Sequence, residues 1–422
     1  MKGNLLLILA VWIYSIISYA QEINGIWHGN LNFNGQKLGL IFHLCKDENG
    51  KPSGKMDIPQ QGVIDMPINL SLLTQDSISL YLPAIGMSYN GKLIQDKIKG
   101  VFKQNGVSIP MNLEQGNIDK PNRPQEPFPP FDYQTEEVSF TNSNAKAVFS
   151  GTLTYPIGYS KEKRIPVVLM VTGSGPQDRN EEVFEHRPFM VIADYLAKNG
   201  IASLRYDDRG VSKSTGKRTG CTSKDYAADA DCGLQWLKDS GKFGKIGVLG
   251  HSEGGLIAFM LGAESKVDFI ISMAGPGIKG DTLLAEQQNA ALRLYGQPTN
   301  RTVESVRAEV SMKPKDSWLN YFINYDPTYT ISQIKIPVMA INGSNDMQVI
   351  SASNLNAIKK ILINKNKKNL FKEYVGLNHL FQHCQRSNSL DYYNIEETCS
   401  EEVLQDIVDW IKNLINYYTT VQ

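Results

Sequence analysis

The chain has 422 residues, and its 43 basic and 43 acidic side chains cancel at neutral pH. Because a single hydrophobic core rarely grows beyond about 250–300 residues, this length predicts two domains. A balanced charge without runs of one sign offers no basic face to a polyanion, which argues against nucleic-acid binding.

The chain begins with a segment typical of a secretory signal peptide. Lys2 precedes an apolar run over residues 5–17, and residues 18–20 (Ser-Tyr-Ala) place small side chains three and one before a cut. The run is shorter than the ~20 residues that cross a bilayer. We therefore expect cleavage after Ala20 and an exported protein, periplasmic or secreted, with no stable membrane span.

Residues 21–115 consist of short runs in which apolar and polar residues alternate, such as "GIWHGNLNF" (25–33). Turn residues separate these runs; "DENGKPSG" (47–54) is one such turn. Many short strands at this spacing predict a small N-terminal all-β domain, either a barrel or a sandwich.

Four residues of this domain are expected in its interior. The aromatic residues Trp27, Phe42 and Tyr81 are expected to be core rather than a ligand platform, and Cys45 to be a buried strand residue.

Residues 116–132, "GNIDKPNRPQEPFPPFD", have five prolines and no hydrophobic periodicity. Such a segment is extended and semi-rigid, so we expect a linker that divides the mature chain in two.

Residues 133–422 alternate short apolar runs, such as "KIGVLG" (245–250), with helical patterns, such as "EGGLIAFMLG" (253–262). Strands buried on both faces of a parallel sheet look like this. The alternation predicts a doubly wound, mostly parallel α/β sheet, with residues 136–142 and 147–156 as an antiparallel hairpin on its edge. Ser223 is expected to be the N-cap of a helix over "SKDYAADADCGLQWLKDSG".

An insert of about residues 275–333 interrupts the alternation. Its amphipathic segment "DTLLAEQQNAALRLYG" places Leu284, Ala291, Leu292 and Tyr295 on one helical face. An insert after the carboxyl end of a strand is where a substrate lid would lie. An ordinary packing helix explains the pattern equally well, and the sequence leaves both interpretations open.

The stretch "GHSEG" (250–254) fits G-x-S-x-G, the pattern that holds a serine on a sharp strand-to-helix turn. A strand pattern precedes Ser252 and a helix pattern follows it. A serine hydroxyl needs a histidine to accept its proton and an acid to orient that histidine. Asp346 and His379 each follow a later predicted strand, in the chain order that this fold requires.

Two rivals of these residues are weaker candidates. Asp268 opens a strand instead of following one, so it lies at the wrong end of the sheet. His383 is the alternative base, but it is farther than His379 from the end of its strand. We therefore predict Ser252, Asp346 and His379 as the catalytic residues.

An oxyanion hole needs two backbone N–H groups. Glu253 follows the nucleophile and supplies the first; Ser174, in "VTGSGPQDR" (171–179), is the expected second donor. That loop lacks the Lys and Ser/Thr ending of a phosphate loop. In the polar loop 207–209, Asp-Asp-Arg, we expect ion pairs that fix the loop rather than substrate contacts.

The five cysteines predict at most one bridge. Cys221 and Cys232 flank most of a predicted helix, too far apart to be joined. Cys384 and Cys399 lie at the two ends of a polar loop and are the plausible pair. Without a histidine cluster, no zinc site is indicated, and neither a metal nor an organic cofactor is expected.

Several of these segments together resemble the bacterial α/β-hydrolase carboxylesterases of the thermophile esterase D type. They are "VTGSGPQDRN", "RYDDRGVSKSTG", "GHSEGG", "INGSNDMQV" and "GLNHLFQ", and the resemblance covers about residue 133 to the C-terminus. "GIWHGNL" and "QQGVIDMPINL" are similar to the β-domain that exported members carry in front. The resemblance implies an α/β-hydrolase fold with a helical lid, with Ser252 as nucleophile, Asp346 as acid and His379 as base.

The expected function is therefore that of an exported serine esterase acting on small, partly hydrophobic esters. Amide-bond cleavage or acyl transfer would use the same residues, and a binding protein on an inactive hydrolase scaffold is the remaining alternative. The acyl and alcohol groups of the substrate and the oligomeric state are left open by the sequence.

Overall fold

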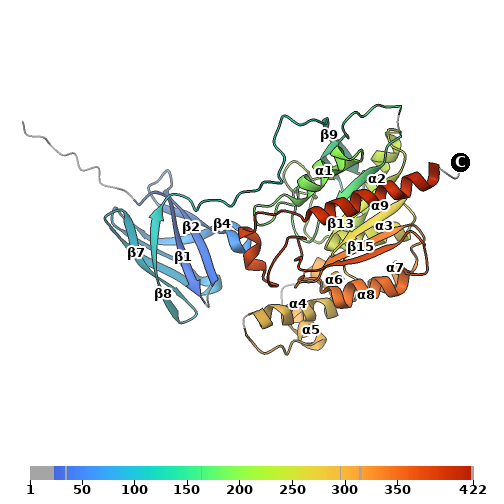
Figure 1. The fold of residues 1–422 in the computed structure, drawn as a ribbon. Helices are drawn as coiled ribbons and strands as arrows, with labels where there is room; N and C mark the ends of the chain where they lie inside the picture. The colour runs from blue at the N-terminus through green and yellow to red at the C-terminus, as the bar shows by residue number, and fades with distance from the viewer. Residues whose placement is uncertain (1–22, 34–35, 163, 295, 313–315, 420–422) are drawn as a thin grey trace, which may run out of the picture. The chain divides into compact units, whose positions relative to one another are not determined.

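The computed structural model describes residues 23–33, 36–162, 164–294, 296–312 and 316–419 (Figure 1). The chain forms two compact units that meet in the sequence between Asp119 and Lys120, inside the predicted linker. The predicted signal peptide, residues 1–20, and Tyr295 lie outside the described residues. No helix in the described ranges is long and apolar enough to cross a membrane.

The first unit is a closed barrel of eight antiparallel strands, in which each strand pairs with the next along the chain. The first and last strands close it, with Trp27 opposite Gln115 and His28 opposite Glu114. Closure leaves no unpaired strand edge, which decides between the barrel and the sandwich. The strands are β1 (Gly25–Phe33), β2 (Gln36–Lys46), β3 (Pro52–Ile58), β4 (Val63–Leu73), β5 (Ser77–Leu82), β6 (Met87–Ile94), β7 (Lys97–Gln104) and β8 (Val107–Gln115).

The interior of the barrel confirms part of the expected core. Trp27 and Phe42 are fully buried, but Tyr81 is 44% exposed and Cys45 is exposed, so two of the expected core residues were wrong. The reason is the two-residue period of a strand: Leu44 points into the core, so the next residue, Cys45, points out.

The second unit is built on one eight-stranded sheet with the order β16-β15-β14-β13-β11-β12-β10-β9 (Figure 1). The strands from β16 to β12 are parallel, and β10 is antiparallel to both of its neighbours. This confirms the predicted parallel sheet with an antiparallel hairpin at its edge. Its strands are β9 (Thr135–Asn142), β10 (Ala147–Thr154), β11 (Val167–Val171), β12 (Ala202–Tyr206), β13 (Ile246–His251), β14 (Phe269–Met273), β15 (Val338–Gly343) and β16 (Leu370–Tyr374).

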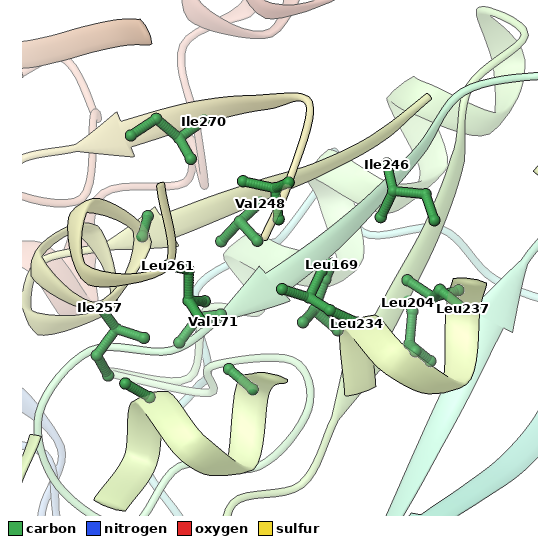
Figure 2. Close-up of a cluster of buried hydrophobic side chains, with 14 of the residues drawn as sticks. Leu169, Val171, Leu204, Leu234, Leu237, Ile246, Val248, Ile257, Leu261 and Ile270 are labelled. Carbon is green, nitrogen blue, oxygen red and sulfur yellow. The ribbon is translucent and has the colours of Figure 1, made fainter. Parts of the chain in front are cut away.

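Helices cover both faces of this sheet, so alternate residues of each strand enter different cores. In β11, Leu169 belongs to the cluster packed under α2, α3 and α8 (Figure 2), whereas Val168 belongs to the cluster under α1 and α9. Burial on both faces explains why these strands read as continuous apolar runs. The five helices are α1 (Pro188–Lys198), α2 (Ser223–Asp239), α3 (Glu253–Ala263), α8 (Ser351–Leu362) and α9 (Glu401–Thr419).

The insert between β14 and β15 is helical, as expected. Leu283 and Phe322 from the insert pack with Leu256 of α3 and with Val349 in a small separate core. Asp281 is buried and pairs with Arg307, which joins α4 to α5. The insert contains α4 (Gly280–Leu294), α5 (Val303–Met312), α6 (Ser317–Asn324) and α7 (Pro327–Ser332).

Part of the predicted linker is fixed to the second unit. The Arg123 guanidinium donates to the carbonyls of Phe184 (3.2 Å) and Glu185 (3.1 Å) on one segment. It also donates to Tyr393 (2.7 Å) and Ile395 (2.9 Å) in the loop that follows His379. A planar guanidinium presents several donors in fixed directions, so a single side chain holds both segments together.

We expect Arg123→Ala to lower the free energy of unfolding by about 1–2 kcal/mol, because four part-buried backbone carbonyls lose a charged donor. Thermal and urea unfolding of the full chain measures the change. The control is Arg123→Lys, which keeps the charge but cannot reach both segments and should recover only a minor part. Unchanged stability in Arg123→Ala would contradict the role of Arg123 in holding the two segments together.

Candidate active site

Ser252 lies on the turn between β13 and α3, as the sequence predicts. Its backbone dihedral angles are φ 53° and ψ −119°, a conformation that non-glycine residues rarely adopt. Such a residue costs of order 1–3 kcal/mol and persists only where its surroundings impose it. The turn presents the side chain of Ser252 at the carboxyl end of the central strand.

The two glycines of the motif are required by close backbone packing. A Cβ atom on Gly250 would overlap with the carbonyl of Gly254, and a Cβ atom on Gly254 would overlap with the carbonyl of Val171. Strand, turn and helix therefore approach one another more closely than any other residue would permit.

Ser252 lines a pocket of about 320 Å³, and His379 lines the same pocket. Residues of the insert form an apolar wall of this pocket, which is what a lid would do; the buried core under α4 and α6 shows that the same helices also pack. The insert residues that line the pocket are Pro276, Leu283, Leu284, Trp318 and Phe322, with Gln287 as the polar exception.

The structure brings Asp346 and His379 together. Asp346 follows β15 and His379 follows β16, and Asp346 Oδ2 lies 2.7 Å from His379 Nδ1. The other carboxylate oxygen of Asp346 accepts the amides of Gln348 (2.8 Å) and Val349 (2.9 Å). Because Asp346 occupies Nδ1, the ring nitrogen left to exchange a proton with a serine is Nε2.

The two rivals lie elsewhere. Asp268 precedes β14 and pairs with Lys245 at the amino end of the sheet. His383 is exposed, and its Nδ1 lies 2.9 Å from Glu397 Oε2. Neither lines the pocket that holds Ser252.

Both predicted oxyanion donors lie at the pocket. Glu253 is the first residue of α3, and Ser174 belongs to the loop after β11; both line the cavity with Ser252. Within the described ranges, neither backbone amide has a hydrogen-bond partner. The neighbouring amide of Gly173 is occupied, since it donates to Glu181 Oε1 at 2.6 Å.

The side chain of Glu253 has a second role that the sequence did not indicate. Its buried Oε1 accepts from Ser223 Oγ (2.6 Å) and from the indole N–H of Trp318 (2.8 Å). Trp318 belongs to α6, so the residue after the nucleophile fixes the insert. Ser223 is the first residue of α2 and Thr222 is its N-cap, so the expected N-cap at Ser223 was wrong by one residue.

The loop 207–209 forms the expected network. Asp207 pairs with Arg179 at 2.8 Å and Arg209 pairs with Asp229. Asp208 accepts from Thr172 Oγ1 (2.8 Å) and from an amide of the loop after β11. Burial raises the pKa of Asp208 to about 8, and the nearby carboxylates of Glu181 and Glu253 contribute.

Cys384 and Cys399, the plausible pair whose bonding the sequence left open, are both free thiols. Cys384 Sγ lies 3.5 Å from the Gly376 carbonyl, whereas Cys399 is buried in the core under α1 and α9. Cys221 and Cys232 are also free. In the described part of the chain, no group of three or more His, Cys, Asp or Glu side chains has the geometry to hold a metal ion.

The topology of the second unit is that of the α/β-hydrolase fold, with a helical insert between β14 and β15, and a closed β-barrel precedes it in the chain. Comparison with known proteins agrees. Residues 186–348 match the family model described as serine aminopeptidase, S33. The chain is 26% identical over 274 residues to esterase EstD of Thermotoga maritima, an alignment that covers 62% of this chain and 65% of that protein.

Solved structures give weaker similarities. An esterase of Pyrococcus furiosus has a TM-score of 0.47 and 18% identity, covering 70% of this chain and 99% of that one. A puromycin-hydrolyzing peptidase of Mycobacterium tuberculosis has a TM-score of 0.46 and 13% identity, and the match covers 88% of this chain and 53% of that one. The family match and the Thermotoga relative confirm the resemblance to bacterial esterases that the motifs predicted.

Proposed function

We propose that this protein is an exported serine carboxylesterase that hydrolyses small, partly hydrophobic carboxylic esters. The observation that carries the proposal is the strained turn that presents Ser252 to the pocket where His379, hydrogen-bonded to buried Asp346, also lies. The similarity to a Thermotoga protein named as an esterase supports it.

In the proposed reaction, Ser252 Oγ attacks the ester carbonyl carbon while His379 Nε2 accepts the hydroxyl proton. The negative charge that forms on the carbonyl oxygen is held by the amides of Ser174 and Glu253. His379 then donates its proton to the leaving alcohol, and the acyl group remains on the serine. A water molecule, deprotonated by His379, attacks the acyl-enzyme. His379 then returns the proton to Ser252 Oγ as the acid leaves, and Asp346 stabilises the imidazolium in both steps.

The lining of the pocket supports a small acyl group with apolar character. Leu283, Leu284 and Phe322 from the insert face the same space as Val349 and Leu380. Apolar walls with few convergent polar groups are typical of sites for small organic ligands. The proposed reaction needs neither a metal nor an organic cofactor.

Peptide or aminoacyl-amide hydrolysis is the second candidate, because the matching family model is described as a serine aminopeptidase. An aminopeptidase needs a carboxylate to bind the ammonium group of its substrate. Among the described lining residues, the carboxylates are Glu181 and Glu253. Oε1 of each already bonds, to His251 and to Trp318, and Glu181 Oε2, which has no partner in the described residues, is buried out of reach of a substrate in the pocket. This arrangement favours an uncharged ester.

Hydrolysis of p-nitrophenyl acetate compared with aminoacyl p-nitroanilides tests this choice. We expect ester turnover and little anilide turnover. Anilide turnover without ester turnover would contradict the esterase and support the peptidase. The absence of both, together with no labelling by an organophosphate, would leave the binding protein on a hydrolase scaffold.

Export is proposed from residues 1–20 alone. Expression of the full chain in a bacterium, followed by cell fractionation and N-terminal sequencing, tests it. We expect a mature protein in the periplasm or medium that begins at Gln21. An uncleaved chain retained in the cytoplasm would contradict export and leave the proposed chemistry untouched.

Trp318 is expected to set the acyl-chain preference, since it lines both the catalytic pocket and a neighbouring groove of about 1160 Å³. Trp318→Ala would join the two spaces and raise the ratio of octanoate to acetate turnover about tenfold in kcat/KM. Trp318→Phe, which keeps the ring but loses the indole N–H, is the matched control and should retain most of the original preference. Identical ratios in all three proteins would contradict this role.

A further inference from the structure

His251, the residue before the nucleophile, is not a passive packing residue. It is 7% exposed, and both ring nitrogens lie at hydrogen-bond distance from buried groups. Nδ1 lies 3.0 Å from Glu181 Oε1, and Nε2 lies 2.9 Å from the backbone carbonyl of His379. The rings of His251 and His379 lie 4.7 Å apart between centroids.

The hydrogen-bond partners of His251 indicate the protonation state of its ring. The His379 carbonyl can only accept, so His251 Nε2 carries a proton. Glu181 Oε1 also accepts the Gly173 amide at 2.6 Å, and as an ionised carboxylate it accepts from Nδ1 as well. An imidazole that donates from both nitrogens is an imidazolium, and Glu181 is its counter-ion.

The surroundings of His251 leave few other charges. The titratable groups near it are Glu181, His379, Asp346 beyond His379, and the free thiol of Cys399, which lines the same small cavity as His251. The remaining neighbours in that cavity are apolar, and they are Pro188, Phe189, Ile192, Met273, Leu380 and Phe381. A pair placed in such an environment interacts more strongly than it would in water.

The pair joins three parts of the site. His251 ends β13 beside Ser252, its Nε2–H fixes the backbone of the base, and Glu181 fixes the amide next to Ser174. We propose that His251, as an imidazolium held by Glu181, is a positioning residue that aligns the base and the oxyanion loop with the nucleophile. This inference rests on the proposed function, since it concerns the same reaction.

The pair makes the alignment dependent on pH. Burial by itself lowers the pKa of His251, but the Glu181 carboxylate, the His379 carbonyl and the charge of Asp346 raise it above its ordinary value. Because the folded-state pKa is raised, the hydrogen bonds of the His251 imidazolium are fully present below the ordinary histidine pKa and are lost as the pH rises through the raised value. An alkaline fall in kcat should follow.

Two conservative substitutions separate the two hydrogen bonds. His251→Gln keeps a donor that reaches the His379 carbonyl, and His251→Asn keeps one that reaches only Glu181. We expect kcat for p-nitrophenyl acetate to fall about 10-fold in His251→Gln and about 100-fold in His251→Asn, with KM within about threefold, because small misplacements of reacting groups are costly. Neither variant titrates, so both should lack the alkaline fall in kcat.

Active sites are counted with an organophosphate, so that kcat refers to folded, labelled enzyme only. Asp208→Asn is the pH control, because Asp208 also titrates near pH 8. An alkaline fall that persists in His251→Gln and vanishes in Asp208→Asn would overturn the inference, as would an unchanged kcat per labelled site in His251→Asn. If His251→Asn does not fold, His251→Gln and the pH profiles decide alone.

Parallel assays of the wild-type protein and Ser252→Ala distinguish a failure of the proposed function from a failure of the positioning role. Wild-type protein that neither hydrolyses esters nor reacts with the organophosphate contradicts the proposed function itself. Wild-type protein that does both, with His251 variants of equal kcat and equal pH profile, contradicts only the positioning role.

Discussion

Ser252→Ala is expected to lower kcat for p-nitrophenyl acetate by about 10⁵–10⁶-fold and to abolish labelling by an organophosphate. The substitution removes the only atom that forms the acyl bond, and serine hydrolases that lose the nucleophile retain little beyond binding and oxyanion stabilisation. The measurement is steady-state hydrolysis, with intact-mass spectrometry of the labelled wild type locating the adduct.

Stability provides an independent check on the same turn. Because Ser252 has φ 53°, Ser252→Gly relieves backbone strain and should raise the free energy of unfolding by about 1 kcal/mol, while kcat is lost as in Ser252→Ala. An organophosphate adduct on another residue, or activity retained in Ser252→Ala, would contradict the assignment of the nucleophile.

Asp346→Asn is expected to lower kcat by about 10⁴-fold while the fold remains intact. An asparagine still accepts the amides of Gln348 and Val349 through its oxygen, so its amide nitrogen faces His379 Nδ1. A donor at that position stabilises the wrong tautomer, in which Nε2 carries the proton and cannot accept one from Ser252.

The matched controls for Asp346 and His379 are Asp268 and His383, the alternative acid and base considered from the sequence. Asp268→Asn and His383→Gln alter an ion pair at the other end of the sheet and an exposed histidine, so both should retain kcat within about threefold. His379→Gln should lose as much as Ser252→Ala. If kcat were lost in His383→Gln and retained in His379→Gln, the general base would be His383 and not His379.

The sequence by itself determined the order of the strands and helices along the chain. Strands buried on both faces need continuous apolar residues, so the parallel sheet was readable without coordinates. The glycines at 250 and 254 are dictated by close packing around the turn, which is why a short motif located Ser252. Asp346 and His379 were predicted as candidates because residues that follow neighbouring parallel strands lie at the same edge of the sheet.

Only the tertiary structure decided which side chains meet across segments far apart in the chain. Closure of the barrel depends on the pairing of β1 with β8, and a free thiol at Cys384 depends on where Cys399 is buried. Glu181 and Trp318 reach the site from a loop and from the insert, and no periodicity or motif in the sequence predicted these contacts. Local pattern encodes which face of an element is apolar, whereas such contacts depend on how the elements pack.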